Sequence, residues 1–417
     1  MRIIGTRWMV GLLFALVCAP GGANGQATRT DSNVRPREAR GTTVDSERDE
    51  QESLFNYYFR EQGYKYQTVL AKLETEASVP AWRIPYSAAI HPESGGGMSD
   101  VRSARPAGLF ARRGRSTASG SSALGLYDRA FNGGEGSANS YEIQRIMGTS
   151  RALFPGLRMR QNTESWEGYC SGFTASTIKH PEPVRAVDAG EVGGAAGIRF
   201  QPSDIKALLS CIYNRTTPDS YLYLAPPSGH DGGPNMGTFH LTLANYIGQA
   251  GHPVGLDRAK GQVAWNNPVY AYTVDSIDDA GTGDGLQYKT VQTTVTYSSY
   301  GSDAERQTDS ETGARVGNRK QSMTFRYTLA LDDQGRIVGG RALSSSGHFL
   351  WIPLYAVQAK RDGSVPGNPY LDVRKVLALA RASALPEAQA KYDAATIGPR
   401  VDPTLASATK AAARSGQ

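Results

Sequence analysis

The amino-acid sequence predicts an α+β domain in which helices come first and an antiparallel sheet follows. Two observations indicate this fold class. The cap-like pair Ser203-Asp204 opens a helical pattern over residues 205–213, and runs rich in β-branched and aromatic residues dominate residues 269–343. Helices grouped before strands are typical of α+β folds, whereas strands and helices alternate in a parallel α/β sheet.

The N-terminus predicts a secretory signal peptide over residues 1–25. Arg2 and Arg7 form a basic start, residues 8–17 are an apolar run, and Ala23-Asn24-Gly25 supplies small residues for cleavage. The apolar run is too short to span a bilayer, and no later segment has the necessary length. We therefore expect a protein without a membrane span that is secreted, to the periplasm or outside the cell.

Charge and cysteine content restrict the partners of the mature chain. The whole chain has 45 Lys and Arg against 39 Asp and Glu, and loss of Arg2 and Arg7 with the leader lowers the net charge from +6 to +4. This mild, dispersed excess does not predict a nucleic acid partner. Cys18 is also lost with the leader, so that Cys170 and Cys211 remain, either as free thiols or as a disulfide.

The region before the domain divides into three parts. Residues 26–50 are polar and charged, and we expect them to be disordered. Residues 51–122 read as a helical pro-region, with its helix at Glu52–Ser78, followed by a basic linker rich in Gly and Ser. An ordinary surface loop is the alternative reading of that linker.

The main domain is expected over residues 123–360, with a C-terminal helix and a flexible tail over residues 361–417. A hairpin turn, Asp332-Asp333-Gln334-Gly335, joins its last two strands. The expected helices are residues 141–154, 205–213 and 373–384, and the expected strands are residues 269–274, 288–297, 322–331 and 336–343.

Cys170 is the candidate nucleophile. It precedes a weakly helical segment, residues 173–179, in a stretch of small residues. A thiol at the start of a helix lies at the positive end of the helix dipole, which favours the thiolate. The alternative is that Cys170 is a small buried apolar residue, as most lone cysteines are.

A catalytic thiol also needs a base, a group that orients the base, and donors for an oxyanion. His240 stands among apolar residues in a segment that must be buried, on either a helix or a strand, and Asp257 follows a short apolar run. The backbone N–H of Cys170 is one donor candidate. Gln161, Asn162, Trp166 and Trp265 are candidates for a second, and the sequence does not choose among them.

Several segments together resemble one family, the transglutaminase elicitor family of secreted oomycete and bacterial proteins. The most specific is Val263–Val269, which is similar to the Trp-Asn-Gln-Pro-Val core of the surface segment that plants recognise in the oomycete members, with Asn267 in the place of Gln. The other matching segments are Leu126-Tyr127-Asp128, Trp166–Gly172, His180-Pro181-Glu182-Pro183, Asp204–Leu209, Gly237–Leu241 and Gly335–Gly340.

This resemblance implies a papain-like or transglutaminase-like core with the nucleophile at a helix N-terminus. It also implies a protein-glutamine γ-glutamyltransferase whose partners are proteins with an accessible glutamine and a lysine or another amine. Carried over to this sequence, Cys170 is the nucleophile, His240 the base and Asp257 the orienting group. His348, in a shortened version of a family motif, is the second choice for the base.

The resemblance further implies dependence on calcium. The acidic group Asp275, Asp278, Asp279 and Asp284 lacks the spacing of an EF-hand loop and reads as a solvated hairpin. Two other functions stay open at this point. One is a papain-like cysteine peptidase or deamidase, and the other is a catalytically idle secreted elicitor or binding protein.

Overall fold

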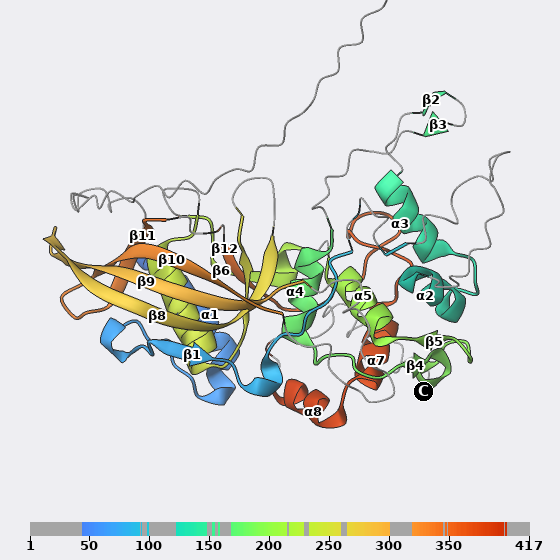
Figure 1. Cartoon of the computed structure of the whole chain (residues 1–417), viewed down its shortest axis with the longest axis horizontal. Coiled ribbons are helices and arrows are strands. Elements are labelled where there is room, and N and C mark those ends of the chain that lie inside the picture. The colour runs from blue at the N-terminus through green and yellow to red at the C-terminus, as the bar shows by residue number, and fades with distance from the viewer. Residues whose placement is uncertain are drawn as a thin grey trace, which may run out of the picture. The chain divides into compact units, whose positions relative to one another are not determined.

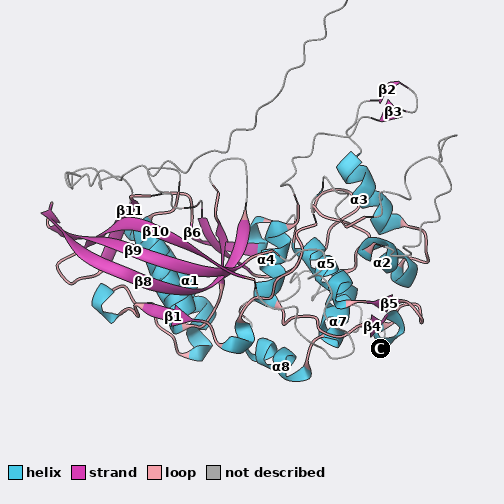
Figure 2. Ribbon diagram, viewed as in Figure 1, coloured by secondary structure: helices cyan, strands magenta, loops and turns pink. Residues whose placement is uncertain are grey.

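An antiparallel sheet of eight strands forms one half of the described fold (Figures 1 and 2). The computed structural model describes residues 44–91, 93, 98–99, 122–147, 152–154, 157–158, 168–214, 217–228, 233–259, 265–300, 319–344, 347, 349–395 and 397. The strand order is β11-β10-β9-β8-β7-β12-β6, and β1 pairs with β8. The strands are β1 (Glu76–Ser78), β6 (Tyr221–Ala225), β7 (Val254–Asp257), β8 (Asn266–Gly283), β9 (Leu286–Ser298), β10 (Lys320–Leu331), β11 (Ile337–Ala342) and β12 (Phe349–Pro353).

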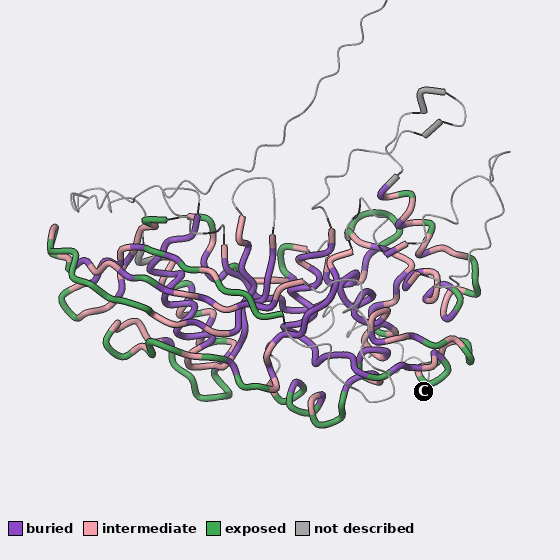
Figure 3. The backbone as a smooth tube through the Cα atoms, in the orientation of Figure 1, coloured by how far each residue is buried: buried purple, intermediate pink, exposed green. Residues whose placement is uncertain are grey.

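The strands expected from residue 269 onward are all present, and the α+β fold class is confirmed. β8 and β9 extend further than expected and form a long hairpin, the tip of which is mostly exposed (Figure 3). The turn between β10 and β11 lies where Asp332–Gly335 predicts it. The Asp332 carboxylate accepts hydrogen bonds from the backbone N–H groups of Gln334 and Arg336 and thereby closes this turn.

The N-terminal region is helical over a different range from the one expected. Helix α1 (Val44–Phe59) begins within the stretch expected to be disordered and ends well before Ser78. A 3-10 turn follows it, and Gly63 then adopts the left-handed conformation with φ of 76°, which ends the helix. The chain continues as an extended segment because Gln67 exchanges hydrogen bonds with the Asn245 side chain.

Alternation along the central strands separates two faces of the sheet. Val254 and Leu256 of β7 belong to the apolar core that contains Phe239 and Tyr327. We call the side they face the α6 face, because it is covered by α6 (Met236–Thr242), the following π-helix η8 (Leu243–Gln249) and α1. Gly255, between the two β7 residues, faces the opposite side, where α4 (Cys170–Lys179) packs. We call this side the α4 face.

Helices form the other half of the fold around a second apolar core (Figure 2). Helix α4 joins the two halves, since it contacts β7, β8 and β12 as well as α5. The other α-helices and strands of the described residues are α2 (Ala123–Phe131), α3 (Ser137–Met147), α5 (Pro202–Tyr213), α7 (Val373–Ser383), α8 (Pro386–Ala395), and the small sheets β2 (Ala152–Phe154) with β3 (Leu157–Arg158) and β4 (Val187–Asp188) with β5 (Arg199–Phe200).

Helices α5 and α7 confirm the sequence expectations for residues 205–213 and 373–384. Gly172 explains how closely α4 and α5 pack. A Cβ atom at Gly172 would lie 1.9 Å from the carbonyl oxygen of Ser210 on α5, so that only glycine fits this position. Of the described helices, none has the length and apolar character that crossing a membrane requires.

Candidate active site

Cys170 is the first residue of α4, as the sequence predicts, and its side chain is 7% exposed. The first N–H groups of a helix lack partners within the helix, so this end carries a partial positive charge. Cys170 and Cys211 are both buried and are not joined by a disulfide. The disulfide that the sequence left open is therefore not formed.

Asn266 lies beside the Cys170 sulfur. Its Nδ2 atom is 4.0 Å from Sγ, and its Oδ1 atom accepts a hydrogen bond of 2.8 Å from the indole Nε1–H of Trp351. The indole nitrogen can only donate, so this bond fixes which end of the amide faces the sulfur. Gly255 makes room for the indole, because a Cβ atom there would lie 2.6 Å from its ring.

Asp257 completes a group of three polar side chains on the α4 face. It is 1% exposed, ends β7, and pairs directly with Asn266 of β8 on one side and Phe349 of β12 on the other. Its Oδ1 atom accepts hydrogen bonds from the backbone N–H groups of Trp265, at 2.8 Å, and Ala259, at 3.2 Å. The structure thus brings the predicted residues Cys170 and Asp257 together.

The pKa of Cys170 is raised above its ordinary value. Burial is the main cause, and the nearby Asp257 charge raises it further, whereas N–H groups of Asn266 and Ser171 lower it. A thiol in this state is mostly protonated at neutral pH. It needs a base to become a nucleophile.

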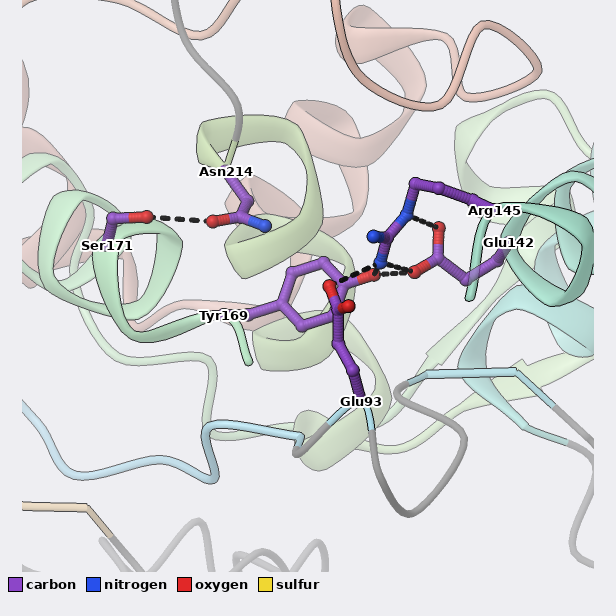
Figure 4. A network of polar contacts seen from close by, with 6 residues as sticks. All are labelled: Glu93, Glu142, Arg145, Tyr169, Ser171 and Asn214. Carbon is purple, nitrogen blue, oxygen red and sulfur yellow. Dashed lines mark hydrogen bonds and ion pairs between the residues drawn. The ribbon is translucent and has the colours of Figure 1, made fainter. Parts of the chain in front are cut away.

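The residue before Cys170 is held at both its backbone and its side chain, and Figure 4 shows the side-chain contacts. The Tyr169 N–H donates to the Ile90 carbonyl at 2.8 Å, and its hydroxyl donates to Glu142 of α3. Arg145 binds both Glu142 and Glu93 and donates to the Tyr169 hydroxyl. These contacts fix the start of α4, and with it the position of the thiol.

His240 lies in a different environment from Cys170. It is on helix α6, which resolves whether its segment is a helix or a strand, and its Nδ1 atom shares a 2.7 Å hydrogen bond with the Tyr327 hydroxyl. Tyr327 belongs to the core of the α6 face, whereas Cys170 and Asp257 lie on the α4 face. Burial lowers the pKa of His240 to about 4.

The predicted oxyanion donors have different outcomes. Gln161, Asn162 and Trp166 lie outside the described residues, as does His348. Trp265 is described, and it donates its backbone N–H to Asp257 while its ring packs 6.0 Å from that of Tyr300. The prediction that its side chain serves an oxyanion stays a prediction.

The acidic group of the β8–β9 hairpin does not fit a calcium site. Asp279 pairs with Lys289, and Asp275 accepts a hydrogen bond from Thr294. Within the described part of the chain, no group of three or more His, Cys, Asp and Glu side chains has an arrangement that could hold a metal ion.

Comparison with known proteins gives two matches. The family model "Transglutaminase elicitor" matches residues 155–383, which is more than half of the chain. The chain belongs to the transglutaminase elicitor family. The fold is also similar to the crystal structure of the GP42 transglutaminase from Phytophthora sojae, with a TM-score of 0.57 and 19% identity, over 80% of this chain and 98% of that chain. No curated protein matches the sequence.

Asn266 is the residue of this transglutaminase elicitor chain that sequence reasoning missed as part of the site. The signal is the run Trp265–Val269, which resembles the core of a surface segment in the oomycete members. In the structure Asn266, Asn267 and Val269 are at most 4% exposed, because β8 lies between β7 and β9. In this chain the segment that resembles the family motif thus lies in the interior, beside the nucleophile.

Proposed function

We propose that this protein is a secreted protein-glutamine γ-glutamyltransferase with Cys170 as its nucleophile. The observation that carries the proposal is the convergence of Cys170, Asp257 and Asn266 at the start of a helix. Family membership and the GP42-like fold support the same reaction class. The leader-like residues 1–25 support secretion.

The reaction follows from a thiol in this setting. The Cys170 sulfur attacks the side-chain carboxamide carbon of a substrate glutamine, and the base passes the thiol proton to the departing ammonia. The S–C bond that forms makes a thioester. An amine, such as a lysine of a second protein, then attacks the thioester, loses a proton to the base and releases the thiol.

We assign the base to His348, the second choice from the sequence, because of its neighbours in the chain. Phe349 pairs directly with Asp257, and a Cβ atom at Gly347 would lie 2.9 Å from the Asp257 carbonyl oxygen. Both residues that flank His348 therefore lie against Asp257. His240 has less support, because its described hydrogen bond is to Tyr327 on the α6 face.

The test is incorporation of a labelled primary amine into an acceptor protein with accessible glutamines. Cys170→Ala should abolish incorporation, and the matched control Cys211→Ala, at the other buried cysteine of the described residues, should retain it. Equal incorporation by Cys170→Ala would refute the thiol mechanism. Ammonia release without incorporation would favour a deamidase or peptidase, in which water resolves the thioester.

The same assay tests the base. His348→Asn should lower the rate by about a hundredfold or more, the usual contribution of a positioned base. His240→Asn should affect folding stability more than chemistry because of its burial. A loss of turnover in folded His240→Asn, with His348→Asn unaffected, would return the role of base to His240.

A further inference from the structure

We propose that the side chain of Asn266 is an oxyanion donor of this active site and that Trp351 is the positioning residue that holds it. The inference rests on the proposed nucleophile Cys170, and it replaces the tryptophan side chains as the source of the second donor. Three observations carry it. They are the position of the amide at the sulfur, the fixed orientation of that amide, and the space made for the indole.

The distance from Asn266 to the sulfur suits an oxyanion better than the sulfur itself. When a thiol adds to a carbonyl, the negative charge develops on the carbonyl oxygen. This oxygen is bonded to the same carbon as the attacking sulfur. A donor must then be about 2.7–3.1 Å from that oxygen. The Nδ2 atom, 4.0 Å from Sγ, is at the outer limit of contact with the sulfur, so it can also reach an oxygen that lies beside the sulfur on the attacked carbon.

The orientation of the amide is determined by chemistry. Trp351 Nε1–H donates to Oδ1, so the two N–H groups of Asn266 have to point away from the indole, on the side of Cys170. An amide that was free to rotate would present its oxygen half of the time, and that oxygen would repel the negative charge. A preorganised donor loses nothing to reorientation when the charge develops.

The surroundings of Asn266 hold it in place. Its backbone carbonyl accepts a 2.9 Å hydrogen bond from the Tyr300 hydroxyl, and its strand lies between β7 and β9. The side chain is 4% exposed, so little water competes for its N–H groups. In the proposed site Asn266 supplies the second donor, in addition to the backbone N–H of Cys170 at the start of α4.

The experiment measures two reactions of the same thiol in the full-length protein. The first is acylation by p-nitrophenyl acetate, in which the sulfur displaces nitrophenolate through an oxyanion. The second is alkylation by iodoacetamide, which forms no oxyanion and whose pH profile reports the thiol pKa. Rates with Cys170→Ala are subtracted in both reactions to remove the background of other groups.

Asn266→Asp keeps the size of the side chain and an oxygen for Trp351, but it replaces the N–H groups at the sulfur with oxygen. We expect acylation to slow by about a hundredfold or more, beyond any change explained by the alkylation profile. Trp351→Phe, which removes the indole N–H, should slow acylation about tenfold. The matched control is Asn267→Asp, on the next residue of β8, where the side chain binds Arg258 and the Ser298 carbonyl instead. It should stay within a few-fold of the wild type.

Two results would overturn the inference. One is acylation within threefold of the wild type in folded Asn266→Asp. The other is a loss that matches a raised midpoint of the alkylation profile, because Asn266 would then act on the thiolate alone. Folding is checked by circular dichroism for each variant. Absence of amine transfer by a wild type that is readily acylated at Cys170 would refute the transferase and leave this comparison of variants valid.

Discussion

At the scale of single residues, the candidate catalytic side chains lie on two different faces of the sheet. Cys170, Asp257 and Asn266 gather on the α4 face, and His240 contacts Tyr327 on the α6 face. A buried histidine within a family motif is therefore a part of the core here. Its titration affects folding, which gives a direct prediction.

His240 should make the protein less stable as the pH falls. Burial lowers its pKa from 6.5 in the unfolded chain to about 4 in the folded one. Between pH 6.5 and about pH 4 the unfolded state therefore binds a proton that the folded state does not bind. The free energy of unfolding falls as the pH is lowered through this range. We expect His240 to account for about 2 kcal/mol of loss between pH 7 and pH 5.

Urea unfolding at the two pH values measures this effect. His240→Asn keeps a polar atom for Tyr327 and does not titrate, so its loss of stability between pH 7 and pH 5 should be smaller by the same amount. An identical loss in the wild type and the variant would contradict the assignment.

At the scale of secondary-structure elements, the position of the nucleophile depends on how α4 packs. α4 meets the central strands on one side and α5 on the other, and Ser171 donates a 2.7 Å hydrogen bond to the Asn214 side chain just after α5. The two helices approach so closely that the backbone of α5 lies where a side chain at Gly172 would be.

Gly172→Ala should therefore destabilise the fold even though alanine favours helices. The added methyl group would meet the Ser210 carbonyl oxygen at 1.9 Å, and backbone cannot move aside as a side chain can. We expect a loss of about 3 kcal/mol or more in the free energy of unfolding, measured by urea denaturation.

The control for this variant is Gly248→Ala, also in a helix. Its Cβ atom would first meet the Tyr272 hydroxyl, at 3.1 Å, at the end of a side chain. Its stability should change by no more than about 1 kcal/mol, since alanine also gains helix propensity. A Gly172→Ala protein as stable as Gly248→Ala would show that α4 and α5 pack less tightly than described.

At the scale of the whole molecule, the N-terminal region is built into the fold. Phe55 and Phe59 of α1 are at most 2% exposed and pack against Tyr246, and β1 adds a strand beside β8. The Ile90 carbonyl binds Tyr169 immediately before the nucleophile. These contacts bear on the expected pro-region, because its removal would uncover the core.

Cleavage in the basic linker should therefore leave the two fragments together. Limited trypsin treatment is expected to cut near Arg112, Arg113 and Arg115. The fragments should coelute in native size-exclusion chromatography and separate only in denaturant. Release of the N-terminal fragment under native conditions, with the remainder still folded, would instead establish a detachable pro-region.

Much of this architecture was open to prediction from the sequence because local patterns determine it. The helical pattern over residues 205–213 predicts α5, although the helix is capped by Gln201 and begins at Pro202 rather than at Ser203-Asp204. Runs rich in β-branched and aromatic residues predict β8 to β11, and small residues around Cys170 indicate the start of α4. What stayed hidden depends on contacts between distant segments. The local sequence does not indicate on which face of the sheet a side chain lies. From the sequence, His240 and Asp257 are therefore equally good partners for the thiol.

The same limit explains the N-terminal region and Asn266. Apolar residues after Phe59 continue a helical spacing, yet hydrogen bonds to Asn245 hold this segment extended. The orientation of the Asn266 amide depends on its hydrogen bond with Trp351, which is 85 residues away in sequence. Such contacts become apparent only once the strand order is known. Asn266 of β8 and Trp351 of β12 meet because both strands pair with β7.

The placement of α1 and β1 has a consequence for the order of events during synthesis. Gln51 donates a hydrogen bond to the Tyr223 carbonyl, and the Gln67 N–H donates one to Asn245, at separations of 172 and 178 residues. β1 can pair only after β8 has been synthesised. The ribosome thus finishes the first ninety residues long before their partners exist. Contacts of such long range form late and slowly. We therefore expect the N-terminal region to reach its native contacts only after the strands of the sheet have been synthesised.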